Sequence, residues 1–460
     1  MYPADTIAAI STALGEGAIG IVRLSGEEAI EFANQVFKGK DLAKVQSHTI
    51  HYGHVVNPRT GQTVDEVMLS VMRGPRSFTR EDIIEINCHG GIVAVQRVLE
   101  MVLLAGARLA EPGEFSKRAF LNGRIDLSQA EATMDLIQAK TAKAMEASVN
   151  QLQGSLSSKI TSLRHEMLQT LAQVEVTIDY PEYDDVEELS SRQLNETARS
   201  VKEQIGRILH QAQHGKVFRE GINTAIIGRP NVGKSSLLNI LTGMEKAIVT
   251  EIAGTTRDTI EEYVNVRGVP LKLIDTAGIR QTDEVVEQIG VEKSRAVMEK
   301  ADLIILVLNQ SEALQTDDIE LLEATRQQSR IILMNKQDLV PVLTHETLAP
   351  YGVKETELIT TSMLDESGLD LLEQQIEQRF FSGSIQSGDI NYLLNTRHTS
   401  LLQQAIDSLD EVIEATELSI PVDLIQIDFT KAWDLLGEIT GESVQDELLD
   451  KLFSQFCLGK

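Results

Sequence analysis

A glycine-rich turn between an apolar strand and an apolar helix constrains this chain more than any other feature. Residues 228–235 read Gly-Arg-Pro-Asn-Val-Gly-Lys-Ser and fit the phosphate-loop pattern. In that pattern, backbone N–H groups surround the α- and β-phosphates, a lysine (here Lys234) reaches the β- and γ-phosphates, and a serine hydroxyl (here Ser235) ligates Mg²⁺. The turn therefore predicts a nucleotide-binding module, and by itself it does not say which nucleotide.

A second motif selects guanine. Residues 335–338, Asn-Lys-Gln-Asp, follow another apolar strand. The carboxylate of Asp338 can accept hydrogen bonds from the ring N–H and the exocyclic amine of guanine, whereas adenine offers no such pair of donors. Between the two motifs, Asp-Thr-Ala-Gly at 275–278 directly follows the apolar stretch 271–274. In this position Asp275 can hold a water of Mg²⁺, and Gly278 can approach the γ-phosphate. The three motifs in this order predict a guanine-nucleotide switch.

The module differs from Ras-like switches in two ways. The amide oxygen of Asn231, inside the phosphate loop, can help to coordinate a monovalent cation, and Gly278 is followed by apolar Ile279 in place of the glutamine that orients water in Ras. Another group must therefore position the attacking water. A threonine hydroxyl in the segment Thr-Thr-Arg-Asp at 255–258 can complete the Mg²⁺ shell when the γ-phosphate is present, which makes this segment the first switch.

The second switch offers several polar groups after Ile279. They are Arg280, Asp283, Glu284 and Glu287. Acidic residues at an exposed helix start also satisfy the helix dipole without any catalytic role. On the residues alone the choice among these groups stays open.

Length and composition indicate about three domains in 460 residues, of which 42% are hydrophobic. The first 22 residues hold no Lys or Arg and include Asp5, so no signal peptide is expected, and the apolar stretches are too short to span a bilayer. We therefore expect a cytoplasmic protein without membrane contact. Two cysteines, Cys88 and Cys457, form neither a disulfide framework nor a zinc cluster, and any role must be as thiols.

Charge is distributed unevenly along the chain. The formal net charge of −27 argues against a protein that coats nucleic acid, since such binding depends on Lys and Arg neutralising phosphates. Residues 1–120 hold 12 Lys and Arg against 14 Asp and Glu, a balance of −2, so the remaining 340 residues hold 30 against 55, a balance of −25. If RNA is bound, the N-terminal segment or a partner protein is the expected surface.

The N-terminal segment has an α+β pattern that we expect to close near residue 120. Strands are predicted at 6–12, 20–24, 64–72 and 82–87, and helices at 27–37 and 92–105. Long amphipathic helices follow at 129–139, 142–176, 191–213, 399–416 and 423–439. An acidic stretch at 181–188 is interpreted as a solvated loop, with an acidic metal site as the alternative.

Helical patterning lies on both sides of the nucleotide module at 220–380. The predicted fold class is therefore multidomain α/β and α+β, with a Ras-like P-loop G domain inserted into one all-α domain; two separate helical domains are the alternative. The predicted domains are 1–120 (N-terminal), 121–219 (helical, first part), 220–380 (G domain) and 381–460 (helical, second part).

The chain resembles the MnmE (TrmE) family of tRNA uridine-modifying GTPases over essentially its whole length. The resemblance rests on Gly-Ile-Val-Arg-Leu-Ser-Gly at 20–26, Pro-Gly-Glu-Phe-Ser-Lys-Arg-Ala-Phe-Leu-Asn at 112–122, the G motifs, and Phe-Cys-Leu-Gly-Lys at 456–460. It implies a homodimer built through the N-terminal, folate-binding-type domains, and G domains that associate when K⁺ and GTP are bound.

The resemblance also assigns site residues. K⁺ would be held by Asn231, Thr250, Ile252 and Thr255, and Mg²⁺ by Ser235 and Thr256. K⁺ so placed would stand in for an arginine finger. Glu287 matches the family's water-positioning glutamate and, with Asn231, Lys234 and Asp275, makes up the catalytic set. The residues expected to bind GTP are Asn231, Val232, Gly233, Lys234, Ser235, Ser236, Thr250, Glu251, Ile252, Ala253, Gly254, Thr255, Thr256, Asp275, Thr276, Ala277, Gly278, Asn335, Lys336 and Asp338.

The implied function is a K⁺-stimulated GTPase that modifies tRNA. With an FAD- and NADH-using MnmG-like partner, in a heterotetramer or larger complex, the family adds a carboxymethylaminomethyl-type group to C5 of the wobble uridine, position 34. Its one-carbon donor is 5,10-methylenetetrahydrofolate or a related folate. The matching folate residues are Arg23, Glu85, Arg124 and Lys460. Arg124 replaces the lysine of some members and offers a broader fork of donors.

Some of these residues also have a purely structural interpretation. Without the resemblance, Arg23 and Glu85 form an ordinary strand-end ion pair. Cys457 is either a partly exposed thiol near the folate region or a small buried hydrophobe.

The motifs of the G module are equally compatible with two other classes of function. A ribosome-assembly switch predicts an appended basic RNA-binding segment, and none is visible in this sequence. A self-assembling scaffold that uses GTP only for dimerisation predicts no folate affinity. GTP hydrolysis coupled to tRNA modification is the function that we expect.

Overall fold

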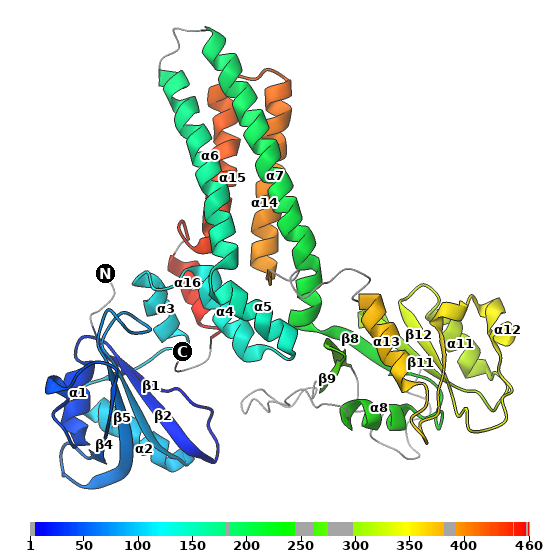
Figure 1. The fold of residues 1–460 in the computed structure, drawn as a ribbon, viewed down its shortest axis with the longest axis horizontal. Helices are drawn as coiled ribbons and strands as arrows, with labels where there is room; N and C mark the ends of the chain where they lie inside the picture. The colour runs from blue at the N-terminus through cyan, green and yellow to red at the C-terminus, as the bar shows by residue number, and fades with distance from the viewer. Residues whose placement is uncertain are drawn as a thin grey trace. The chain divides into compact units, whose positions relative to one another are not determined.

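The computed structural model describes residues 5–179, 184–243, 262–274, 298–380, 392–444, 446–456 and 459. The chain divides into two compact units. Unit 1 contains residues 1–134, 157–197 and 407–460, and unit 2 contains residues 135–156 and 198–406. Each unit combines a β-sheet with helices (Figure 1).

Unit 1 is built on a seven-stranded sheet with the order β3-β4-β5-β6-β2-β1-β7. Its strands are β1 (Ile7–Ile10), β2 (Gly17–Ser25), β3 (Phe37–Lys38), β4 (Thr49–Val56), β5 (Thr63–Met72), β6 (Ile83–Gly90) and β7 (Arg108–Leu109). Buried and more exposed residues alternate along β4 and β5, as expected for strands with one face on a core. Only the β1–β7 pair is parallel among the strand pairs described in this sheet.

Two helices bury one face of this sheet. Helices α1 (Ala29–Val36) and α2 (Ile92–Leu104) place side chains such as Val98 against Leu69 and Ile86 in one hydrophobic cluster. The opposite face near β1 receives helix α3 (Glu114–Leu121), whose Phe115 is fully buried. A short 3₁₀ helix, η1 (Leu42–Lys44), packs against α1. The sheet is thus covered on both faces where β1 and β2 run.

Helices from before and after the nucleotide module pack together in unit 1. They are α6 (Ser155–Asp179), the first part of α7 (Asp184–Glu220), the last part of α14 (Thr396–Glu417) and α15 (Val422–Thr440) (Figure 1). The amide of Asn195 donates to Thr416 Oγ1 at 2.5 Å, and the guanidinium of Arg164 stacks 3.9 Å from the ring centroid of Trp433. Helices α4 (Leu127–Gln138) and α16 (Asp446–Phe453) share a smaller cluster with Phe120 and Phe456.

Unit 2 is built on a six-stranded sheet with the order β13-β12-β11-β8-β10-β9. Its strands are β8 (Ile222–Ile227), β9 (Glu262–Val266), β10 (Val269–Leu273), β11 (Leu303–Asn309), β12 (Arg330–Asn335) and β13 (Leu358–Thr360). All pairs are parallel except β9–β10. Strands β11 and β12 are buried along their whole length because two hydrophobic clusters cover the two faces.

Helical segments accompany this sheet in unit 2. They are α5 (Ala142–Leu152), α8 (Lys234–Gly243), α11 (Thr316–Ala324), α12 (His345–Leu348), α13 (Leu369–Phe380) and the 3₁₀ helices η2 (Ala349–Tyr351) and η3 (Glu355–Glu357). The side-chain oxygen of Gln151 on α5 accepts a hydrogen bond from Leu393 N at 3.2 Å. Arg219, near the end of α7, forms an ion pair of 2.8 Å with Asp135.

The predicted fold class is confirmed, and several details of the element prediction are wrong or incomplete. The helix predicted at 142–176 is two helices, α5 and α6, because Gly154 adopts a left-handed φ of +92° that ends the first one. Helix α7 begins at Asp184, inside the stretch predicted as a loop. Strand β4 and helix α16 were not predicted, since their patterns are short and depend on tertiary neighbours.

Candidate functional site: a nucleotide module and an Arg23–Glu85 site

The phosphate loop runs from the end of β8 to the start of α8. Asn231 has a φ of +62°, a left-handed conformation that Asn tolerates better than most residues. Gly233 has a φ of +109°, and a Cβ on it would lie 2.2 Å from Nδ2 of Asn335, so only glycine fits. The loop leads directly into Lys234, the first residue of the ten-residue helix α8. Free N–H groups at such a helix start favour a bound phosphate.

Lys234 folds back over the loop that precedes it. Its Nζ donates to the carbonyl oxygens of Gly228 at 2.8 Å and of Arg229 at 2.6 Å. Burial lowers the pKa of the Lys234 ammonium from its ordinary value. Ser235 follows as a half-buried residue, and Ser236 is exposed. The lysine charge is thus held inside the loop, where a phosphate would compete with the two carbonyls.

Arg229 ties the phosphate loop to the connection after β11. Its Nε lies 2.8 Å from Oδ2 of Asp318 on α11, and its Nη2 lies 3.3 Å from Oε2 of Glu312. Burial opposes the charge on Arg229, but its contacts with Asp318 and Glu312 outweigh burial and raise its pKa. The carboxylate of Asp318 is almost completely buried. This pairing holds the backbone carbonyl that Lys234 contacts.

Asn335 joins the phosphate loop to the region expected to bind the base. Its Nδ2 donates to the carbonyl oxygen of Val232 at 2.7 Å, and its Oδ1 accepts from the backbone N–H of Met363 at 3.2 Å. Asn335 ends β12 and is buried. Lys336 follows with a left-handed φ of +70°. The Asn-Lys-Gln-Asp motif therefore sits beside the phosphate loop, at the carboxyl edge of the parallel sheet where ligands of such folds bind.

Two residues that contact the Asn-Lys-Gln-Asp motif were not predicted from the sequence. The hydroxyl of Ser362 donates to Oδ1 of Asp338 at 3.0 Å, and Met363 supplies the N–H that Asn335 accepts. Both follow β13, which lies parallel to β12. The one available signal was a short apolar strand ending in Thr360 with polar residues after it. The backbone N–H of Gln337 also donates to Thr361 O at 3.1 Å, so this loop and the motif hold each other.

Many predicted G-site residues lie outside the described part of the chain. These are Thr250, Glu251, Ile252, Ala253, Gly254, Thr255, Thr256, Asp275, Thr276, Ala277, Gly278, Arg280, Asp283, Glu284 and Glu287. The described chain reaches Ile274, whose N–H donates to Thr224 O at 3.1 Å beside β8. The described residues bring together the phosphate loop, Asn335, Lys336 and Asp338.

Two of the predicted folate-binding residues, Arg23 and Glu85, lie on the sheet of unit 1. Arg23 on β2 and Glu85 on β6 are cross-strand partners, with Nη2 and Oε1 2.8 Å apart. Nη1 of Arg23 also donates to the carbonyl oxygen of Gly459 at 3.3 Å, and the hydroxyl of Ser11 donates to the same oxygen at 3.1 Å. The guanidinium carbon lies 5.7 Å from the Phe115 ring centroid, within cation–π range. The end of the chain thus meets the Arg23–Glu85 pair.

Of the two other predicted folate residues, the structure describes only Arg124. Arg124 is exposed after α3, and in the described regions it forms no ion pair or hydrogen bond with Arg23 or Glu85. Lys460 and Cys457 lie outside the described residues.

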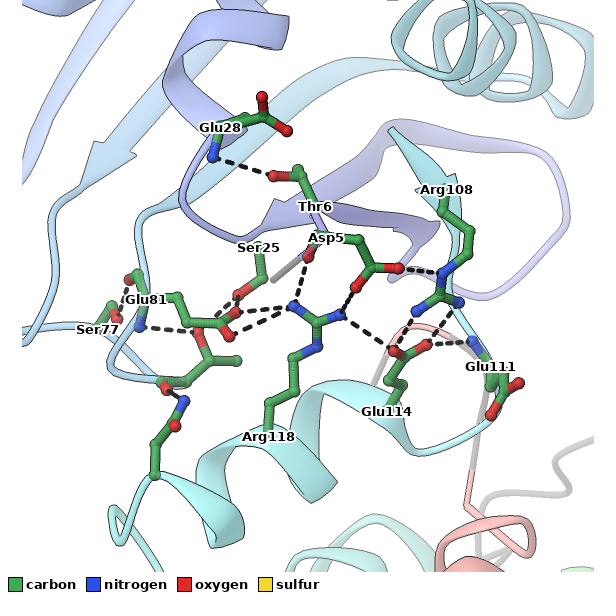
Figure 2. Close-up of polar contacts among 12 residues, drawn as sticks. Asp5, Thr6, Ser25, Glu28, Ser77, Glu81, Arg108, Glu111, Glu114 and Arg118 are labelled. Carbon is green, nitrogen blue, oxygen red and sulfur yellow. Dashed lines mark hydrogen bonds and ion pairs between the residues drawn. The ribbon is translucent and has the colours of Figure 1, made fainter. Parts of the chain in front are cut away.

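An ion-pair network holds α3 against the sheet (Figure 2). Arg118 on α3 contacts Asp5 Oδ1 at 2.7 Å, Glu114 Oε1 at 3.2 Å and Glu81 Oε2 at 3.3 Å. Arg108 also contacts Asp5 and Glu114, each at 2.5 Å. Burial opposes ionisation of Asp5 and Glu114, but hydrogen bonds from the arginines prevail and lower both carboxyl pKa values. The network positions the segment that leads to Arg124.

Cys88 is a buried thiol on β6. Its Sγ donates to Gly20 O at 3.3 Å. Burial, assisted by the negative charge of Asp65, raises the pKa of Cys88 to about 11. Cys88 is therefore a thiol, not a thiolate, at neutral pH.

Within the described residues, no group of three or more His, Cys, Asp or Glu side chains is placed to hold a metal ion. Among the helices of that same part of the chain, none is both long and apolar enough to cross a membrane.

Comparison with known proteins places the chain in a family. A family model described as the GTP-binding protein TrmE N-terminus matches residues 6–124, and one described as the MnmE helical domain matches residues 127–457. A protein of Enterococcus faecalis named tRNA modification GTPase MnmE is 64% identical over 458 residues, which cover 99% of this chain and 98% of the relative. A protein of the same name from Bacillus cytotoxicus is 60% identical over 456 residues, 99% of each chain.

Solved structures give partial matches. The G domain of the Thermotoga maritima FeoB iron transporter is 25% identical, with 35% of this chain and 99% of that chain covered and a TM-score of 0.26. Aquifex aeolicus Era bound to GDP and aluminium fluoride is 26% identical, with 41% and 66% covered and a TM-score of 0.26. The two family models and the relatives, which match nearly end to end, are decisive: the chain belongs to the MnmE (TrmE) family of tRNA modification GTPases.

Proposed function

We propose that this GTPase is stimulated by K⁺ and modifies the wobble uridine of certain tRNAs. In this proposal it works with an FAD- and NADH-using MnmG-like partner and adds a carboxymethylaminomethyl-type group to C5 of uridine 34, taking the carbon from 5,10-methylenetetrahydrofolate or a related folate. Hydrolysis of GTP drives association and release of the G domains of a cytoplasmic homodimer. The supporting observation is the 64% identity to a tRNA modification GTPase over 99% of the chain.

The nucleotide part of the proposal is supported by Asn335. This side chain bridges the carbonyl of Val232 in the phosphate loop and the N–H of Met363 in the loop after β13. One amide therefore sets the spacing between the phosphate-binding and the base-binding ends of the site. Asp338, held by Ser362, presents the carboxylate that discriminates guanine. Lys234 and the start of α8 supply positive charge and N–H groups for the phosphates.

We propose that two cations bind at the phosphate loop. Ser235, in the first turn of α8, is the proposed Mg²⁺ ligand, with Thr256 and the carboxylate of Asp275 completing the site. Asn231 is exposed on the loop in a left-handed conformation, and we propose its amide oxygen as a K⁺ ligand with Thr250, Ile252 and Thr255. Such a cation supplies positive charge against the charge that develops on the transferred phosphoryl group. Glu287 is proposed to position the attacking water.

The folate part of the proposal is supported by the Arg23–Glu85 pair. The Arg23 guanidinium contacts Glu85 Oε1 through Nη2 at 2.8 Å and through Nε at 2.9 Å, close to Gly459. Together this guanidinium and carboxylate can recognise a ligand that carries both donors and acceptors. Arg124 and Lys460 are the proposed further contacts. We also propose that the chain forms three domains. These are an N-terminal domain (1–120), a helical domain (121–219 with 381–460) and a G domain (220–380).

The deciding experiment is GTP hydrolysis in K⁺ and in Na⁺ at equal ionic strength. We expect strong, selective activation by K⁺, and equal rates would leave a GTPase without the proposed cation site. In parallel, a titration of the full-length protein with 5-formyltetrahydrofolate tests the second site. We expect specific binding that is lost in Arg23→Ala; absence of binding to the parent protein would contradict the folate assignment.

A further inference from the structure

Two touching turns of unit 1 present arginines that form no ion pair with any carboxylate in the described part of the chain. The first turn, residues 73–80, connects β5 to β6, and the second, residues 122–124, follows α3. Nη1 of Arg80 donates to the carbonyl oxygen of Asn122 at 2.8 Å, and the amide of Asn122 donates to Thr79 O at 2.6 Å. The two turns are therefore held together. Arg76, Arg80 and Arg124 are all exposed on them.

The lack of carboxylate partners does not reflect a shortage of acidic residues in the chain. The chain carries 69 Asp and Glu against 42 Lys and Arg. Even so, among the residues described here, no carboxylate lies within ion-pairing distance of Arg76, Arg80 or Arg124.

The neighbouring carboxylates are all engaged elsewhere. Glu81 turns inward to Arg118 and accepts from Ser25 Oγ at 2.7 Å. Oδ1 of Asp82 accepts from the backbone N–H of Gly74 at 2.9 Å. Oδ1 of Asp126 accepts from Ser128 Oγ at 2.8 Å at the start of α4. The acids next to these turns thus build the fold, and the three exposed arginines are left without a carboxylate among the described residues.

The fold also tolerates strain to keep Arg80 in place. Arg80 has a φ of +62°, a left-handed conformation that costs a non-glycine residue free energy. Its position is held by the contact of its own side chain with Asn122 and by the packing of Gly74 against its carbonyl group, where a Cβ on Gly74 would come within 2.6 Å. Backbone strain that the surroundings maintain is found most often at functional positions.

The turns lie next to the Arg23–Glu85 site. Ser25 Oγ lies 2.6 Å from Oγ1 of Thr79 in the first turn, and Ser25 is two residues after Arg23 on β2. Residues two apart on a strand point to the same face of the sheet, so the arginine turns flank the face that carries Arg23 and Glu85. A polymer bound along the turns would pass beside that site.

From these observations we infer that Arg76 and Arg80, with Arg124 beside them, bind the phosphate backbone of the tRNA substrate. Guanidinium groups pair with phosphates in a bidentate manner, and RNA helices are recognised chiefly through their backbone. In a chain of net charge −27, a polyanion can approach closely only where arginines gather without carboxylates, which is the property of these turns. The inference rests on the proposed function, because that function supplies the RNA.

The test compares two charge-matched variants of the full-length protein. One is Arg76→Gln with Arg80→Gln. The control is Lys38→Gln with Arg59→Gln, which removes the same charge from the same domain. Lys38 lies on edge strand β3, and Arg59 is in the turn at the opposite end of β5 from residues 73–80; both are exposed. Binding of a labelled, unmodified tRNA transcript is measured over a series of NaCl concentrations, and GTP hydrolysis and thermal melting verify folding.

We expect the Arg76/Arg80 variant to bind tRNA about tenfold more weakly at ~100 mM salt, with a salt slope smaller by about 2, because each lost phosphate contact reduces the slope by roughly 1. The control should keep the affinity and slope of the parent, and both variants should hydrolyse GTP like the parent. Equal binding by both variants, an equal loss in both, or no binding by the parent would overturn the inference. So would loss of affinity for a polyglutamylated folate with unchanged tRNA binding.

These outcomes are separable from a failure of the proposed function. K⁺ dependence of GTP hydrolysis and folate binding at Arg23 are measured without tRNA. Unchanged tRNA binding by the Arg76/Arg80 variant therefore removes this surface and leaves the proposed function standing. Conversely, a parent protein without K⁺ stimulation leaves the RNA-binding comparison valid.

Discussion

The hydroxyl of Ser362 donates a hydrogen bond of 3.0 Å to Oδ1 of Asp338. This contact joins the loop after β13 to the carboxylate that is expected to read guanine. Ser362 is buried whereas Asp338 is exposed, so the hydroxyl orients a side chain that would otherwise be free to rotate. The proposed reading of guanine by Asp338 would therefore depend on Ser362, a residue 24 positions further along the chain.

Replacing Ser362 by Ala should weaken GDP and GTP binding about tenfold. A hydrogen bond to a charged group contributes about 1.5 kcal/mol, and its loss leaves Asp338 unoriented. Binding of ATP, which does not use this carboxylate, should change little, so the ratio of GTP to ATP affinity should fall. Equilibrium titration with fluorescent nucleotides measures both. Ser329→Ala, at the opposite end of β12, is the matched control, and an equal loss in this control would contradict the orienting role.

The left-handed backbone of Asn231 predicts that two substitutions will differ. Asn231→Gly and Asn231→Ala both remove the amide oxygen and should both abolish K⁺ stimulation of GTP hydrolysis. Glycine adopts a φ of +62° without strain, whereas alanine costs about 1 kcal/mol, so only the Ala variant should also bind GDP several-fold more weakly. Hydrolysis assays in K⁺ and Na⁺ and GDP titrations separate the two effects. Retained K⁺ stimulation in Asn231→Gly would exclude the amide as a ligand.

The Arg118 network predicts acid sensitivity of unit 1. The carboxyl pKa values of Asp5 and Glu114 lie below their ordinary values of 3.8 and 4.5. A depressed pKa in the folded state means that the stabilisation is complete above the ordinary value and disappears as the pH falls through the lower, folded value. The melting temperature of the parent should therefore fall as the pH is lowered from about 5 to about 3, as scanning calorimetry can measure.

Arg118→Met tests the same network at neutral pH. The substitution leaves Asp5, Glu81 and Glu114 short of one partner, and it should lower the free energy of unfolding by about 3 kcal/mol and flatten the acid dependence. Arg97→Met is the control, because the Arg97–Glu100 pair is exposed and should contribute almost nothing. Equal melting temperatures for the two variants at pH 7 would show that the network does not stabilise the fold.

Burial of Cys88 predicts that its thiol is silent in the native protein. With a pKa raised to about 11, only a very small fraction is thiolate at pH 8, and the side chain is shielded from reagents. A Cys457→Ser variant should therefore show no rapid reaction with a disulfide reagent until it is unfolded, after which one thiol should react. Rapid labelling of the folded variant would show that Cys88 is accessible.

Local motifs could be read from the sequence because their chemistry needs neighbouring residues. The phosphate loop and the Asn-Lys-Gln-Asp motif each place their groups within a few positions, and the order of the motifs along a parallel sheet brings them to one edge. Periodicity likewise predicted α2, α4, α14 and α15 to within a few residues. Glu287 and the K⁺ and Mg²⁺ ligands in the switch segments stay predictions.

The spacing of residues in the sequence could not reveal features that depend on contacts between residues far apart in the chain. The merged helix prediction at 142–176 failed because both halves are amphipathic, and only the left-handed turn at Gly154 separates them. Nothing in the sequence pairs Ser362 with Asp338, Arg229 with Asp318, or Arg118 with Asp5. These partners are joined by the packing of whole elements, which has no fixed sequence separation.

The sequence by itself determined the class of ligand, since a phosphate loop and a guanine-selecting carboxylate are local chemical patterns that any correct fold must present. The tertiary structure decided how those groups are held and what surrounds them. It engaged Glu81 and Asp82, beside Arg80, in other contacts, set Asn335 between the two ends of the nucleotide site, and brought Gly459 to Arg23 across 436 positions of chain. The physical reason is that the direction of a side chain and its partner are set by packing in three dimensions, whereas the sequence records only its type and position.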